Sequence, residues 1–428
     1  MVKYYLLTIF ALMLFGVPAV SSRFGTQVDE ISQLFSQVTD QFAAVILSHN
    51  PKSIAGIHSR YDSPIGIISP QSTEAPKVRI LIVPGHEPGY GGAEYRDLKE
   101  RIMTVELGQH LATFLKNDPH YQVFITRDSS DWMPEFVTYF HDHWDDIVAW
   151  ERASAADMVH SISVGKTTHA ISVVRHNTAP KEVAYRLYGI TKWANENDID
   201  ITIHIHFNDD TEHPSGQPGT HTGFAIYIPE HQYANGTTSR AVAEAVLKRL
   251  QKYNPVSDLN GESSGIVEDP DLIAIGANNT ADAASVLIEY GYIYEPQFAD
   301  TQTRSVAITD LAYQTYLGLE DFFDSNNATI LSRAYDTVSL PYSWIRVIAG
   351  NDTQNTDVFA LQTALAVDGE YPPVNKDFNQ CPRTGKFGTC TRDALKAFQM
   401  KYGIADEKNI VGEKTLHILN QNFGLRSI

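Results

Sequence analysis

The sequence lacks the excess of basic residues that binding to nucleic acid or to anionic lipid favours. Its formal net charge is −18 over 428 residues. Because nucleic acid and anionic membranes attract positively charged surfaces, the composition argues against both as partners. The acidic excess lies almost entirely ahead of Arg346, and the nearly neutral stretch that follows is expected to be a separate unit.

The chain also lacks a second long hydrophobic run. Residues 1–22 begin with Lys3, continue with an apolar run from Tyr4 to Val17 and end in small residues, which is the pattern of a signal peptide. A retained N-terminal anchor is the alternative, although the run is short for a membrane span. We therefore expect a secreted protein, with no membrane contact after signal removal.

Cysteine is scarce as well, since only Cys381 and Cys390 are present. No nearby CxxC or histidine pair gives them the spacing of a zinc site. In an exported chain, two cysteines separated by a short loop containing proline and glycine favour a disulfide. Two free thiols, or half of a metal site, remain as alternatives.

What the chain does contain is an alternation of strand-like and helical patterns, and its length suits two or three domains. Such alternation predicts an α/β fold with a central twisted β-sheet flanked by helices. Residues 129–180 interrupt it as an insertion or a lid, and residues 27–49 have the spacing of an amphipathic helix. The strand-like runs are "VRILIV", "YQVFITRD", "DIDITIHIHF", "TGFAIYIP" and "ASVLIEYGYI", and the helical patterns include "TVELGQHLATFLKN" and "TSRAVAEAVLKRLQKY".

The C-terminal stretch reads as a small domain of three short amphipathic helices separated by turns that contain glycine. A polar segment of weak periodicity over residues 324–345 is expected to be the linker in front of it. Five large apolar side chains are predicted to form the core of this domain: Leu361, Leu365, Phe387, Leu395 and Phe398.

Polar side chains lie where several of these predicted elements begin or end. His86 follows the buried strand "RILIV", His206 lies near the end of another central strand, and Glu100 begins a long helix. Open α/β sheets hold their ligands at the carboxyl ends of their strands. Two histidines and a carboxylate, with a fourth position left for water, form one known type of hydrolytic zinc site.

Glu289 ends a further apolar strand, "VLIEYGYI". A glutamate paired for structural reasons is one interpretation. Beside a zinc site the residue fits a general base.

Several other residues compete for these roles. His204 lies two residues before His206, hence on the same face of the strand, and Glu94 and Glu106 are carboxylates near Glu100. The pair His141 and His143 has metal-like spacing, but no partners are evident and a surface or lid position is favoured. "GESSG", residues 261–265, matches the nucleophile motif G-x-S-x-G, yet no strand precedes it, so that function is rejected.

Six segments together resemble the zinc-dependent N-acetylmuramoyl-L-alanine amidases, which cleave the stem peptide from peptidoglycan. The resemblance covers about residues 78–320 and implies that Zn²⁺ is held by His86, Glu100 and His206, with Glu289 as the catalytic glutamate. The six segments, in family order, are "IVPGHEPGYGGA", "LKERIMTVELGQHLATFL", "VFITRD", "ANENDIDITIHIHFN", "GFAIYIP" and "VLIEYGYI".

The family pattern also separates the competing residues. His206 is preferred because Phe207 and Asn208 follow it, as in the family's His-Ala-Asn, which leaves His204 at a position usually held by serine. Glu100 is preferred because it alone follows the Leu-Lys of the pattern.

The chain departs from the family pattern at three further positions. Val83 stands where the family usually has aspartate, and Glu87 stands where it has glycine. Ile190 replaces a common arginine, for which Arg186, one helical turn earlier, is a potential substitute.

The C-terminal stretch resembles a peptidoglycan-binding domain, so peptidoglycan is the expected partner. The two resemblances together imply a location in the cell envelope, in the periplasm or the cell wall. We expect a monomer, and a protein activator is left open. Two other functions compete: a zinc peptidase or carboxypeptidase that acts on stem peptides, and a cell-wall-binding protein that has lost catalysis. The predicted division of the chain is a signal peptide (1–22), a helical or extended N-terminal region (23–77), the catalytic domain (78–323), the linker (324–345) and the peptidoglycan-binding domain (346–428).

Overall fold

The computed structural model describes residues 49–63, 76–176, 178–210, 213–214, 216–323, 335–349, 355–408 and 410–425. The predicted signal peptide, and the helix predicted over residues 27–49 except for its last residue, lie outside these ranges. The chain divides into two compact units, Met1–Ser48 and His49–Ile428, and the structure described below is that of the second.

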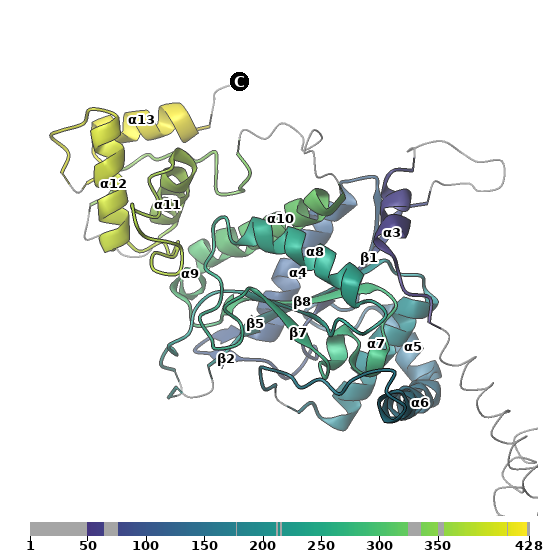
Figure 1. The fold of residues 1–428 in the computed structure, drawn as a ribbon. Coiled ribbons are helices and arrows are strands. Elements are labelled where there is room, and N and C mark those ends of the chain that lie inside the picture. Colours follow the sequence, from purple (N-terminus) through teal and green to yellow (C-terminus); the bar gives the residue numbers. More distant parts are fainter. Residues whose placement is uncertain are drawn as a thin grey trace, which may run out of the picture. The chain divides into compact units, whose positions relative to one another are not determined.

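A mixed sheet of six strands forms the centre of the larger domain (Figure 1), in the order β4-β1-β5-β8-β6-β7. β4, β1, β5 and β8 are parallel, whereas β6 is antiparallel to β8 and parallel to β7. The α/β fold with a central sheet is thus confirmed. The strands are β1 (Val78–Pro84), β4 (Tyr121–Ile125), β5 (Ile201–Asn208), β6 (Ala225–Pro229), β7 (Ile266–Asp269) and β8 (Ala284–Tyr292), and a separate two-stranded ribbon is made by β2 (Glu94–Tyr95) and β3 (Leu98–Lys99).

Helices cover both faces of this sheet (Figure 1). One face packs against α4 (Glu100–Lys116), α8 (Gly236–Leu250) and α10 (Thr301–Phe323), which share a continuous apolar core with the strands. On the other side lies α7 (Lys181–Glu196). A short 3-10 helix, η1 (Ile273–Ile275), contacts α7 and packs in a small apolar cluster with β6 and β8.

The sequence of β5 shows how the sheet positions the histidines. Ile201, Ile203 and Ile205 are fully buried in the core shared with the helices. Because side chains alternate along a strand, His204 and His206 lie together on the opposite face. His206 is the one nearer the carboxyl end, where β5 leaves the sheet.

Helix α3 (Ile54–Tyr61) lies ahead of the predicted catalytic domain but contributes to the same core. Ile57 is buried there, and Arg60 Nη1 lies 3.0 Å from Asp200 Oδ2. The carboxylate of Asp200 also accepts a hydrogen bond from the backbone of Arg79 in β1. Helix α3 therefore helps to fix the edge of the sheet opposite the candidate site.

The interrupting segment over residues 129–180 contains two helices, α5 (Pro134–Asp142) and α6 (Trp144–Ser163), which pack on α7. Phe136 of α5 contacts Trp193 of α7 with ring centroids 4.7 Å apart. Further along, His176 Nε2 lies 3.1 Å from Asp269 Oδ2 at the end of β7. A lid function for this segment stays a prediction.

Three helices form the C-terminal domain, α11 (Thr356–Asp368), α12 (Thr389–Lys401) and α13 (Glu413–Phe423), as predicted. All five apolar side chains named above for its core are buried. Cys381 and Cys390 form a disulfide, which confirms the pairing favoured by the sequence.

Within the described ranges, none of the helices combines the length and the apolar character needed to cross a bilayer.

Candidate metal centre

The first candidate ligand, His86, lies on a loop whose conformation requires glycine at two positions. His86 has a φ of +69°, directly after β1. A Cβ on Gly85 would lie 2.4 Å from Cε1 of His206, and a Cβ on Gly92, whose φ is +82°, would lie 2.7 Å from Cδ2 of His86. Real side chains do not tolerate such distances, so both glycines are needed for the loop to bring His86 against His206.

His86, Glu100 and His206 converge at the carboxyl edge of the sheet. The imidazole Nε2 of His86 lies 2.8 Å from Oε2 of Glu100, and Nδ1 of His206 lies 3.1 Å from Oε1 of the same carboxylate. The two imidazole centroids are 4.8 Å apart. One ligand-type atom from each residue falls within 4.8 Å of the others, so the three can share one ion.

Glu100 is held in place by its backbone neighbours. Its Oε2 accepts a hydrogen bond of 2.7 Å from the amide of Ala93, and its Oε1 accepts one of 3.0 Å from the amide of Phe207. Burial by itself would raise the pKa of Glu100, but the neighbouring imidazoles of His86 and His206 outweigh burial and lower it. The side chain is therefore a fixed carboxylate at the start of α4.

The chemistry of this set suits a metal cation. Nε2 of His86 is buried and, despite its closeness to Glu100, has no partner in hydrogen-bond geometry. Burial lowers the pKa of His206, which favours the neutral imidazole that binds metals. Two imidazole nitrogens and a carboxylate match the ligand types of catalytic zinc sites.

Glu289 lies directly beside this group, paired with His206 in the register between β5 and β8. Its Oε2 is buried without a hydrogen-bond partner. Burial, together with the carboxylates of Glu100 and Glu262, raises its pKa well above the ordinary value. A carboxyl group with these neighbours is suited to accepting and returning a proton.

His204 is not part of the group, although it competed with His206 in the sequence. It is 1% exposed, neither ring nitrogen has a hydrogen-bond partner, and burial beside His206 lowers its pKa to about 3. The register pairs His204 with Val83 of β1. Two departures from the family pattern are thus neighbours in the sheet, where an apolar side chain adjoins a neutral imidazole.

The rival carboxylates lie elsewhere. Glu94 is exposed and pairs with Arg101 at 2.6 Å, and Glu106 does not join the group of ligand-type side chains. His141 is a surface residue, bonded to Asp142. These positions agree with the choice of Glu100.

Glu87, which replaces the glycine of the family pattern, forms an ion pair with an arginine. Nε of Arg186 donates to Oε1 of Glu87 at 2.8 Å, and its Nη2 donates to the hydroxyl of Tyr90 at 3.3 Å. Ile190, at the position of the family's usual arginine, is buried in the core. Arg186 therefore reaches the loop that bears His86 from one turn earlier in α7.

Arg127 was missed as a site residue, although it ends the segment "VFITRD". It is fully buried, with Nε donating to the carbonyl of Pro84 at 3.1 Å and Nη2 donating to the carbonyls of Gly85 and Arg101. Burial lowers the pKa of Arg127 to about 10, opposed by Glu87 and Glu100. The sequence feature that could have identified Arg127 is its position just after an apolar strand. Its guanidinium joins the His86 loop to the first turn of α4.

Glu262, in the rejected "GESSG" motif, was also not identified from the sequence as a residue near the site. Its buried carboxylate accepts hydrogen bonds from the hydroxyls of Tyr227 and Ser257, and it lies near enough to Glu289 to affect that residue's pKa. No sequence signal points to this placement, because it depends on how a turn folds back on β6.

A second group of ligand-type side chains, Glu230, His231 and Glu268, lies at the other end of β6 and β7. His231 is mostly exposed, and Arg240 already forms an ion pair with Glu268. Because a bound arginine competes with a cation for that carboxylate, the group around Glu100 is the better candidate.

The fold and the group at the sheet edge define an α/β protein with a candidate metal centre at the carboxyl ends of its parallel strands. Residues 80–321 match the family model described as N-acetylmuramoyl-L-alanine amidase, and residues 354–419 match that of a putative peptidoglycan binding domain. The first match covers more than half of the chain, so the protein belongs to the N-acetylmuramoyl-L-alanine amidase family. It is an enzyme that hydrolyses the amide bond between N-acetylmuramic acid and L-alanine in peptidoglycan.

Solved structures similar to this chain include an N-acetylmuramoyl-L-alanine amidase from Clostridium difficile 630, at 16% identity and a TM-score of 0.37, over 59% of this chain and 99% of that one. The amidase Ami1 from Mycobacterium smegmatis has 16% identity and a TM-score of 0.38, over 58% and 98% of the two chains. The catalytic domain of CwlV from Bacillus (Paenibacillus) polymyxa var. colistinus has 16% identity and a TM-score of 0.35, over 57% and 98%. No curated protein matches the chain.

Proposed function

We propose that the protein is a zinc-dependent amidase in which His86, Glu100 and His206 hold the ion and Glu289 is the general base. The observation that supports this most strongly is the convergence of those three side chains on one point, with the unpartnered carboxyl oxygen of Glu289 next to it. Zinc supplies a nucleophile at neutral pH by lowering the pKa of a water molecule, and it polarises the carbonyl that is attacked.

The side chains around the ion have separate tasks. Glu289 accepts the proton of the attacking water and transfers it to the departing amine of L-alanine. The buried carboxylate of Glu100 stays fixed by the amides of Ala93 and Phe207, which keeps one ligand in place throughout the reaction. Arg127 positions the loop of His86 without contacting the reacting atoms.

The domain organisation completes the proposal. Export is directed by the segment before residue 23, which is then removed. The amide bond is cleaved by the domain of residues 78–323. Peptidoglycan in the cell envelope is bound by the domain of residues 346–428. The catalytic part is strongly acidic, so its net charge gives no attraction to an anionic wall. Retention on intact sacculi then depends on the C-terminal domain.

Product analysis separates an amidase from a peptidase. Mass spectrometry of a digest of purified sacculi should find complete stem peptides that begin with L-alanine, together with glycan strands carrying unsubstituted lactyl groups. Products in which one or more amino acids stay attached to muramic acid would indicate a peptidase or carboxypeptidase. A metal-loaded protein that binds sacculi and releases nothing would indicate a wall-binding protein without catalysis.

A further inference from the structure

Arg383 of the C-terminal domain is buried against the catalytic domain. It is 4% exposed, and its Nη2 lies 2.8 Å from Oδ2 of Asp310 in α10, which is 1% exposed. Its Nε donates to the carbonyl of Tyr253 at 3.0 Å, and its Nη1 donates to the hydroxyl of Thr363 in α11 at 2.8 Å. A buried charge is costly unless it is paired and hydrogen-bonded, and here partners from both domains meet that requirement.

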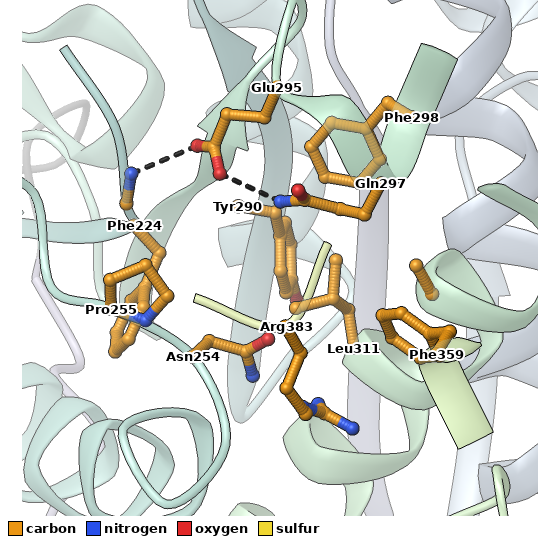
Figure 2. A pocket seen from close by; sticks show the side chains of 12 residues that line it. Phe224, Asn254, Pro255, Tyr290, Glu295, Gln297, Phe298, Leu311, Phe359 and Arg383 are labelled. Atoms are coloured by element: carbon orange, nitrogen blue, oxygen red, sulfur yellow. Dashed lines mark hydrogen bonds between the residues drawn. The ribbon is translucent and has the colours of Figure 1, made fainter. Parts of the chain in front are cut away.

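Two aromatic rings complete the surroundings of this guanidinium. Its central carbon lies 4.9 Å from the ring centroid of Tyr253, in the catalytic domain, and 5.0 Å from that of Phe359, in the C-terminal domain. Each contact falls within the range of a cation–π interaction. Figure 2 shows Arg383 and Phe359 next to Leu311, along a small pocket whose lining comes from both domains. The pocket has room for about one water molecule.

Asp310 also binds the chain that leads into the C-terminal domain. Its Oδ1 accepts hydrogen bonds from the hydroxyl of Thr337, at 2.8 Å, and from the amide of Val338, at 3.2 Å. Just before them, Asp336 accepts hydrogen bonds from the side chains of Lys252 and Tyr253. The entering chain is therefore fixed to the same part of the catalytic domain that holds Arg383.

Arg383 lies within a short loop that a disulfide closes. Cys381 and Cys390 close a loop that contains Arg383. Just ahead of this loop, Nδ2 of Asn379 donates to the carbonyl of Val256 in the catalytic domain at 2.6 Å. A closed loop loses less conformational entropy when it is ordered in an interface than an open one does.

We infer that the disulfide-closed loop is an internal docking element, in which Arg383 binds the catalytic domain and holds both domains as one body. Peptidoglycan bound by the C-terminal domain would then lie at a fixed reach from the sheet edge that bears His86. The protein would cleave peptidoglycan at a fixed distance from its point of attachment. Domains that move independently of each other would not impose that limit. The limit on the cleavage distance rests on the proposed function, whereas the docking itself rests on contacts outside the candidate metal centre.

Small-angle X-ray scattering of the full mature chain tests the docking. Arg383→Gln and Asp310→Asn should each increase the maximum dimension of the protein relative to wild type. The double variant should show no larger increase than either single variant, because both changes break the same ion pair. The Cys381→Ser/Cys390→Ser variant should behave in the same way. Lys401→Gln is the matched control, since Lys401 pairs with Asp368 within the C-terminal domain, and its scattering should equal that of wild type.

Two results would overturn the inference: wild type that scatters as two independently moving domains, or Arg383→Gln and Asp310→Asn proteins as compact as wild type. Should Arg383→Gln unfold the C-terminal domain, Asp310→Asn decides the question, because it leaves that domain's sequence intact. Retained binding to sacculi confirms that the domain is folded in that variant. Because release of stem peptides is measured separately, failure of the docking can be told apart from failure of the amidase assignment.

Discussion

Glu289→Gln is expected to lose peptidoglycan cleavage by a factor of about 10²–10⁴, the range typical of a general base. Glutamine keeps the size of the side chain but cannot accept the proton of the attacking water. Since Glu289 lies beside the three candidate ligands and is not one of them, the variant should bind as much zinc as wild type. Release of stem peptides from sacculi, measured with zinc content on the same preparation, checks both statements.

Glu94→Gln is the matched control for this variant. Glu94 is an exposed carboxylate in β2 that lies outside the group of candidate ligands, and its side chain is 53% exposed, so its loss should change the rate little. A Glu289→Gln protein that releases stem peptides at the rate of Glu94→Gln would remove Glu289 from the mechanism.

Arg127→Met should destabilise the catalytic domain and loosen the candidate metal centre. Methionine fills part of the volume, but the carbonyls of Pro84, Gly85 and Arg101 lose their buried donor. The carbonyl of Gly85 still has the hydroxyl of Thr104 as a donor at 3.4 Å. At about 1–3 kcal/mol for each unsatisfied group, a loss of at least about 2 kcal/mol is therefore expected, or roughly 4–8 °C in Tm for a domain of this size. Because the first candidate ligand follows Gly85, zinc affinity should also fall by about 10–100-fold.

Arg79→Met distinguishes this positioning role from a general loss of stability. Arg79 lies at the opposite end of β1, where its guanidinium bonds the carbonyl of Asn197 and the side chain of Gln122. Thermal unfolding and competition with a zinc chelator should show a smaller fall in Tm and an unchanged zinc affinity. Equal zinc affinities in the two variants would show that Arg127 does not position the His86 loop.

The parts of the fold that the sequence predicted are those with strong local signals. β1 and β8 contain the apolar runs "ILIV" and "VLI", and β5 alternates isoleucine with polar side chains. Both patterns are recognisable as strands without any tertiary information. Four candidate site residues could be selected because each lies near the end of a predicted strand or at the start of a predicted helix, and because the family pattern marks the same positions: His86, Glu100, His206 and Glu289. The carboxyl edge of a parallel sheet then brings them together.

The parts that were missed depend on contacts between distant segments. β7 is only four residues long, which is too short for periodicity to separate it from a turn. Glu262 and Arg383 look like surface residues in the sequence, since nothing local indicates that each is buried among partners from other elements. The choice of His206 over His204 came from the family pattern, because periodicity alone places both on one face of β5 and does not separate them.

Zinc content is the most direct test of the central claim that His86, Glu100 and His206 form the metal centre of an amidase. Elemental analysis should find about one zinc per wild-type chain and almost none in His86→Ala or His206→Ala, with stem peptides released from sacculi by wild type alone. His141→Ala, which changes an exposed histidine, should match wild type in both respects. Zinc retained in His86→Ala and His206→Ala, or a wild-type protein that stays free of zinc and inactive after reconstitution, would contradict the claim.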